Sequence, residues 1–87
     1  MSERRHESLL PGFKEMAERR RALAEELVSR RVALGLSQTE VAARMGTSQS
    51  AVARFESGQA DVRLSTLERY AAAVGHVLDW RLQDRGR

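Results

Sequence analysis

The sequence predicts a mainly all-α protein, a compact bundle of about five helices followed by one short β-strand near the carboxyl terminus. Several stretches repeat apolar residues at helical spacing, and they end at glycines that suit left-handed helix ends: Gly46, Gly58 and Gly75. After the last of these glycines the apolar residues alternate instead, which is the period of a strand. The 87 residues suffice for one small domain, close to the size at which a single core is just sufficient.

A first short helix is marked by its start and its end. Ser37 followed three residues later by Glu40 forms a capping box, in which the hydroxyl and the carboxylate satisfy free amides at a helix start. The helix should therefore begin near Gln38. Its apolar face and its end are given by four residues: Val41, Ala42, Met45 and Gly46.

A second short helix follows directly. Either Thr47 or Ser48 can cap its start. Val52 and Phe55 give it an inward apolar face, and Gly58 ends it. The small or polar residues that remain point outward: Ser48, Gln49, Ser50, Ala53 and Arg54.

Two short helices joined by a tight turn form a helix-turn-helix, and the outward residues of the second helix suit a DNA groove. A glutamine amide can pair with adenine, an arginine fork can pair with guanine, and short side chains permit close approach. An ordinary helical hairpin with a polar surface would show the same local pattern. The pattern alone leaves both interpretations open.

The stretch from Gly35 to Gly58, GLSQTEVAARMGTSQSAVARFESG, resembles the Xre family, the helix-turn-helix class of lambdoid phage repressors. The resemblance runs from about residue 27 to residue 75, and it implies sequence-specific binding of double-stranded DNA. By this resemblance, Gln38 contacts a phosphate and braces the first base-reading residue. Arg31 and Glu56 match a structural ion pair that ties the first helix of the family to the end of its third.

The resemblance also implies which side chains read the DNA. The residues from Ser48 to Ser50 match base-contacting positions at the start of the recognition helix, and Arg54 matches a later groove-facing position. This chain has Ser50 and Ala53 where phage repressors often have longer polar side chains, so direct readout should rest mainly on Gln49 and Arg54. The predicted DNA-binding residues are Gln38, Thr47, Ser48, Gln49, Ser50, Ala53, Arg54 and Arg63.

The composition is consistent with a cytoplasmic DNA-binding protein and does not prove one. The absence of cysteine excludes disulfides and thiolate metal sites, and no apolar run approaches the roughly 20 residues of a membrane span. The net charge of +3 is modest, but fourteen of the fifteen basic residues are arginine, which suits contacts with phosphate and guanine. A GC-rich genome would produce the same arginine-rich composition.

The amino-terminal region divides at a Pro-Gly turn signal. Residues 1–12 are expected to form a flexible tail and not a targeting peptide. From Phe13 the apolar residues follow helical spacing, as one long helix or as two helices broken near Arg21. Residues 13–21 extend beyond the part of the chain that the resemblance covers. The three arginines at 19–21 either touch DNA phosphates or form a solvated face paired with nearby acids.

A further packing helix, with the sequence LSTLERYAAAV, follows the loop after Gly58 and ends at Gly75. This helix should close the bundle, so that the predicted DNA-binding domain spans residues 13–75. Arg63 lies near its start and can reach the DNA if the loop lies beside the backbone. The free amides at the helix start would add a weak positive pole there.

Residues 76–87 are expected to hold a dimerisation strand and a tail. Val77, Asp79 and Arg81 alternate with an apolar set that forms one face: Leu78, Trp80 and Leu82. A lone strand cannot satisfy its own edge, so this segment should pair with the same segment of a second subunit about a two-fold axis. A frayed helix with Trp80 laid on the core is the alternative.

The carboxy-terminal run RLSTLERYAAAVGHVLDWRL resembles a subset of the Xre family, the HigA-like antitoxins. The resemblance implies a homodimer that represses its own operon and binds a RelE-fold toxin. A two-fold dimer would require a palindromic operator. Free-standing regulators also carry such an ending, so a repressor without a toxin stays open.

No catalytic residue, metal site or cofactor is predicted. His6 and His76 have no evident acidic or nucleophilic partner, and the hydroxyls of Thr47, Ser48 and Ser50 lack a base. Helix capping and groove contacts explain those hydroxyls. The alternative to DNA binding is a helical protein–protein interaction module, which a gel-shift measurement on genomic fragments would distinguish.

Overall fold

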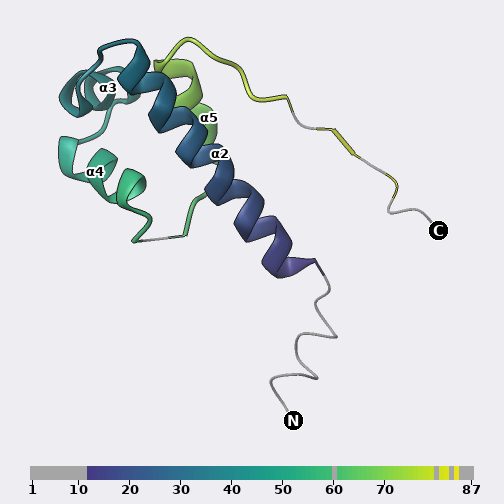
Figure 1. Cartoon of the computed structure of the whole chain (residues 1–87). Helices are drawn as coiled ribbons and strands as arrows, with labels where there is room; N and C mark the ends of the chain where they lie inside the picture. The colour runs from purple at the N-terminus through teal and green to yellow at the C-terminus, as the bar shows by residue number, and fades with distance from the viewer. Residues whose placement is uncertain (1–11, 60, 80, 83, 85–87) are drawn as a thin grey trace.

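The computed structural model describes residues 12–59, 61–79, 81, 82 and 84, and this part of the chain contains four helices (Figure 1). They are α2 (Phe13–Ala33), α3 (Gln38–Met45), α4 (Gln49–Ser57) and α5 (Leu64–Ala73). α2 and α3 both pack on α4 and on α5. The amino-terminal end of α2 extends away from α3 and α4, as Figure 1 shows. The all-helical fold class is therefore confirmed for the described residues.

Two details of the structure differ from the prediction. Residues 13–33 form one helix with no break near Arg21, so the described bundle has four helices and not about five. No glycine or proline interrupts this stretch, which leaves every backbone hydrogen bond of the helix possible. No strand is present in residues 76–79, 81, 82 and 84. A strand needs a neighbouring strand to pair with, and the described residues of the single chain offer none.

The core lies where the four helices meet. Its largest fully buried side chains come from α3, α4 and α5: Val41, Val52, Leu67 and Tyr70. α2 adds Ala24 and Leu27, which are three residues apart and so lie on one face of that helix. No helix in the described part of the chain has the length and hydropathy needed to cross a bilayer.

A three-residue turn joins α3 to α4. The Ser37 hydroxyl accepts from the Glu40 amide at 3.0 Å while the Glu40 carboxylate accepts from the Ser37 amide at 2.7 Å, which is the predicted capping box. Gly46 ends α3 at a φ of 73°, a left-handed conformation that favours glycine. The Ser48 hydroxyl accepts from an amide in the first turn of α4 at 3.1 Å, so Ser48 and not Thr47 caps that helix.

Replacing Leu67 with alanine should destabilise the bundle strongly, because Leu67 has no exposed surface and its removal leaves a cavity between α5 and the other helices. We expect a loss of about 2 to 5 kcal/mol in the free energy of unfolding, measured by chemical denaturation. Leu64→Ala on the same helix is the control, since Leu64 is 44% exposed. Equal losses for the two variants would contradict this account of the core.

Candidate nucleic-acid interface

The first turn of α4 lies at the surface of the protein. Four of the predicted DNA-binding residues are exposed there or in the turn that precedes it: Thr47, Ser48, Gln49 and Ser50. A fifth, Arg54, is exposed in the last turn of the same helix. Ala53 is half-buried. The structure therefore brings the residues expected to read bases together on one short helix.

Gln38 and Gln49 link the two helices of this motif. The Gln38 amide nitrogen donates to the Glu56 carboxylate at 2.9 Å. Because a carboxylate only accepts, the Gln38 amide oxygen faces the other way. That oxygen accepts from the Gln49 amide nitrogen at 2.6 Å. Gln49 therefore keeps its own oxygen and its second N–H for an outside partner.

The Glu56 carboxylate accepts hydrogen bonds from three side chains. Its Oε2 accepts from Arg31 Nε at 2.7 Å and from the Tyr70 hydroxyl at 2.5 Å. Its Oε1 accepts from Arg31 Nη2 and from Gln38 Nε2, both at 2.9 Å. Only 9% of the Glu56 side chain and 15% of the Arg31 side chain are exposed. The structure thus places Arg31 and Glu56 in a two-pronged ion pair that is mostly shielded from water.

These bonds decide the charge state of the cluster. Burial by itself raises the pKa of the Glu56 carboxyl, but the hydrogen bonds from Arg31, Tyr70 and Gln38 outweigh burial and lower it. For Tyr70, burial and the bond to Glu56 raise the pKa of the phenol. At neutral pH the carboxylate is therefore charged and the tyrosine hydroxyl is a donor.

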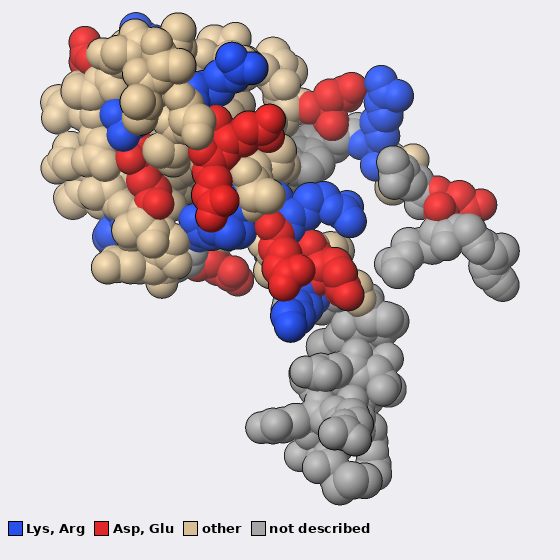
Figure 2. Space-filling model, in the orientation of Figure 1, with Lys and Arg blue, Asp and Glu red and all other residues tan. Residues whose placement is uncertain are grey.

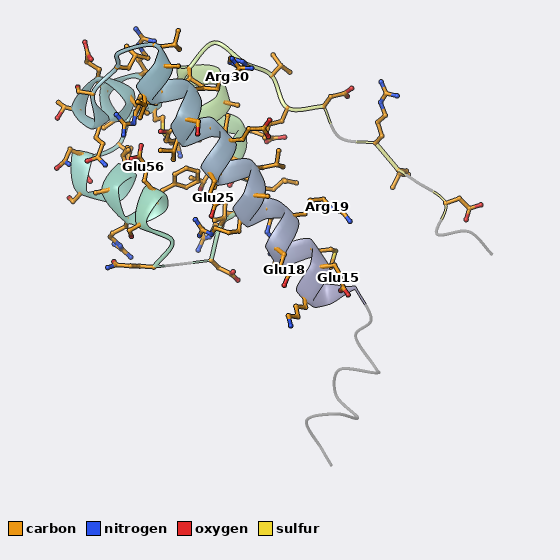
Figure 3. All side chains as sticks on the ribbon, in the orientation of Figure 1. Glu15, Glu18, Arg19, Glu25, Arg30 and Glu56 are labelled. Carbon is orange, nitrogen blue, oxygen red and sulfur yellow. The ribbon has the colours of Figure 1, made fainter. Side chains whose placement is uncertain are left out.

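The cluster joins all four described helices. Arg31 comes from α2, Gln38 from α3, Glu56 from α4 and Tyr70 from α5. Figure 3 shows Glu56 on the side of α4 that faces α2. Arg31 also donates from Nη1 to the Leu36 carbonyl at 2.7 Å, which fixes the loop between α2 and α3. Sequence reasoning treated Tyr70 only as a packing residue, because nothing near it in the sequence marks a hydrogen bond to Glu56.

Comparison with known proteins agrees with this geometry. A family model described as helix-turn-helix matches residues 21–77, about two thirds of the chain. The chain belongs to the helix-turn-helix family. The match spans the exposed face of α4, Glu56 and the three residues that bond to Glu56, and it confirms the resemblance drawn from the sequence.

Individual relatives of this helix-turn-helix protein cover different shares of the chain. Antitoxin HigA1 from two strains of Mycobacterium tuberculosis is 48% identical over 67 residues, which is 74% of this chain and 45% of HigA1. An uncharacterized HTH-type transcriptional regulator of Haemophilus influenzae is 39% identical over 57 residues, 66% of this chain and 58% of the regulator. The chain thus spans less than half the length of HigA1. No solved structure gives a significant match.

Arg63 lies beside the helix-turn-helix at the start of α5. It is exposed, and its side chain makes no capping bond to the amides of that helix. Arg54 and Arg63 line the same cavity of about 260 Å³, which Asp61 also lines. The fold therefore places a second arginine, the residue that precedes α5, next to α4.

Several arginines of the helix-turn-helix protein bind backbone carbonyls, a role that sequence reasoning missed. The pairs are Arg20 with Val62 at 2.9 Å, Arg44 with Ala73 at 2.9 Å and Arg69 with Met45 at 2.5 Å. The sequence analysis predicted that the arginines at 19–21 touch DNA phosphates or form a solvated face. Arg20 instead donates to a backbone carbonyl of its own chain. Each of these carbonyls is 24 or more residues away in sequence, so no local pattern reveals the contact.

Acidic side chains gather along α2, as Figure 2 shows. The exposed acids of this helix are Glu15, Glu18, Glu25 and Glu26. Figure 3 shows the three labelled members of this group, Glu15, Glu18 and Glu25, spaced along α2. The same helix also exposes Lys14, Arg19 and Arg30, so its surface carries both signs of charge.

The predicted dimerisation residues do not share one environment. Leu78 is half-buried and packs against the core of its own chain, whereas Leu82 is fully exposed. Trp80 lies outside the described residues. The expected apolar face is therefore divided, because Leu78 packs against the core of its own chain while Leu82 faces solvent.

His76 Nδ1 lies 3.0 Å from the Val74 carbonyl, and the described residues contain no group of three or more side chains that could hold a metal.

Removing the Glu56 side chain should have a large cost, because it leaves the Arg31 guanidinium without its partner in a mostly shielded position. For Glu56→Ala we expect a loss of about 3 to 5 kcal/mol in the free energy of unfolding. Glu25→Gln, at an exposed position of α2, should change it by less than about 0.5 kcal/mol. A Glu56→Ala variant that melts within a degree or two of the parent would show that the cluster contributes little.

The Glu56 cluster should also make stability depend on pH. The folded pKa of Glu56 is lowered, so its contribution is present above the unfolded carboxyl pKa of about 4.3 and is lost as pH falls through the lower folded value. Melting temperatures of the parent and of Glu56→Gln should therefore differ at pH 7 and converge as pH falls below about 4. A difference that stays constant down to acid pH would contradict the lowered pKa.

Proposed function

We propose that this protein is a sequence-specific regulator of transcription that places α4 in the major groove of double-stranded DNA. The observation that carries the proposal is the bond between Gln38 and Gln49. It joins an exposed residue at the start of α4 to the shielded cluster around Glu56. A base-reading side chain needs such support, because its amide must meet a base edge in one orientation.

Base readout follows from the groups that Gln49 leaves unbonded. Its amide oxygen can accept from adenine N6 and its second N–H can donate to adenine N7, which is the paired contact that distinguishes adenine in the major groove. Arg54 is exposed on the same helix and carries the fork that pairs with guanine. Ser48, Ser50 and Ala53 are short, so they permit close approach of the helix to the bases.

Contacts with the DNA backbone would set the position of the protein. Gln38 has a second amide N–H that its bond to Glu56 does not use, and this hydrogen can meet a phosphate. Thr47 and Arg63 are exposed next to α4 and can do the same. Such contacts position a protein on the duplex without reading its sequence.

An antitoxin role is the more specific form of this proposal, and the similarity to antitoxin HigA1 supports it. In this form the protein represses its own operon and neutralises a RelE-fold toxin. The alternative is a repressor without a toxin. If the antitoxin form is right, co-expression of this protein should relieve the growth arrest caused by a RelE-fold toxin encoded beside its gene. Absence of relief would favour a repressor that has no toxin partner.

We further propose that the protein acts as a homodimer on a palindromic operator. Two copies of α4 held about 34 Å apart would meet successive major grooves on one side of the duplex. The apolar residues beyond α5 are the candidate contacts between subunits. Leu82, which is fully exposed, supports this assignment better than Leu78, which packs on its own core.

The readout proposal predicts a selective loss of affinity. The parent protein is first used to select its preferred duplex from random-sequence DNA. Gln49→Ala or Arg54→Ala should then weaken binding to that duplex by roughly 1 to 3 kcal/mol and binding to unselected DNA much less. Gln59→Ala, an exposed glutamine beyond the end of α4, is the control. Equal losses on both kinds of DNA would assign Gln49 and Arg54 to backbone contacts instead.

The dimer proposal predicts that a charge on the intersubunit face separates the subunits. Leu82→Asp should give a monomer by light scattering and weaken binding to the full operator. Val77→Asp is the matched control, since Val77 is 92% exposed but belongs to the other alternating set. A Leu82→Asp protein that remains dimeric would place the interface elsewhere on the chain.

A further inference from the structure

The loop that joins α4 to α5, described at residues 58, 59 and 61–63, is held by the first half of α2. Arg20 Nε donates to the Val62 carbonyl at 2.9 Å, across 42 residues of sequence. This bond is partly buried. The extension of α2 is therefore part of the structure that surrounds α4.

Arg21 contacts the other end of the same loop. Gly58 ends α4 at a φ of 77°, and a Cβ added there would lie 3.2 Å from both Cζ and Nη1 of Arg21. The Arg21 guanidinium thus lies against the backbone where α4 stops. Two successive arginines of α2 touch the two ends of one loop.

These contacts hold the backbone on the amino-terminal side of Arg63. The Val62 side chain is 7% exposed and packs in the core, while its carbonyl is held by Arg20. On the other side, the Arg63 carbonyl accepts the Leu67 amide at 3.0 Å in the first turn of α5. The backbone of Arg63 is thereby held from both directions, while its side chain is exposed beside Arg54.

We propose that Arg20 is a positioning residue for DNA binding. It holds the loop in one conformation, so that the backbone of Arg63 is already in position for its side chain to contact a DNA phosphate. This inference rests on the proposed DNA-binding function. Arg20 acts through the Val62 carbonyl, so its own guanidinium is not the group that meets the DNA. Arg21 supports the same loop at Gly58.

A double-mutant cycle tests the proposal. Arg20→Met, Arg63→Ala and the double variant are titrated with the duplex that the parent protein selects from random-sequence DNA, at several salt concentrations. Arg63→Ala should weaken binding several-fold and reduce the salt slope by about 1, as loss of one phosphate contact does. Arg20→Met should reproduce much of that loss, and the double variant should bind no more weakly than Arg63→Ala.

Arg19→Met is the matched control, because it removes the same charge from an adjacent exposed residue of α2. Figure 3 shows Arg19 on the side of α2 away from α4. A general loss of structure would not couple Arg20 to Arg63 in particular, so the cycle is repeated with Gln49→Ala, where the effects should be additive. If Arg20→Met melts below the assay temperature, Arg20→Gln, whose shorter amide replaces the guanidinium, takes its place in the cycle.

Hydrogen exchange gives a second measurement. Amides in residues 59–63 should exchange faster in Arg20→Met than in Arg19→Met. If the parent selects DNA but Arg20→Met binds it as Arg19→Met does, or adds its full effect to that of Arg63→Ala, the positioning role is wrong. Unchanged exchange in the loop would also overturn it. A parent protein that selects no duplex would instead overturn the proposed function itself, and this inference with it.

Discussion

The Glu56 carboxylate is the constraint on which the rest of the structure depends. It is mostly removed from water, and a charge in that position is costly unless it is paired and fully hydrogen-bonded. Arg31, Gln38 and Tyr70 meet that demand, and each comes from a different helix. The carboxylate can be satisfied only when all four helices are in place, so it favours one arrangement of a small bundle over other compact ones.

The same cluster connects stability with the proposed readout. A surface glutamine ordinarily loses side-chain entropy when it binds, because it must adopt one of many rotamers. Here the Gln38 amide is oriented by Glu56 and in turn orients Gln49 at the start of α4. The group proposed for recognition is thereby oriented, in the protein alone, by the interaction that holds the helices together.

The long helix α2 gives the two sides of the molecule different roles. Its surface carries exposed acids and exposed basic residues together, while Arg20 and Arg21 contact the loop that follows α4. Charge on this helix is therefore divided between the solvated surface and support of a loop. The three successive arginines therefore have different surroundings. Arg19 is exposed, Arg20 donates to the Val62 carbonyl, and Arg21 lies beside Gly58.

The sequence by itself determined the start of α3 and the ends of α3 and α4, because caps and glycine stops act between residues three or four apart. It left two candidates for the cap of α4, of which the structure has Ser48. It also determined the buried stripes, since helical spacing places residues such as Val41 and Val52 on one face. The pairing of Arg31 with Glu56 came from family resemblance and not from a local pattern. The tertiary structure alone decided that Tyr70 completes that cluster and that Arg20 reaches Val62. These contacts span 14 and 42 residues, and they depend on how helices pack, which no short stretch of sequence encodes.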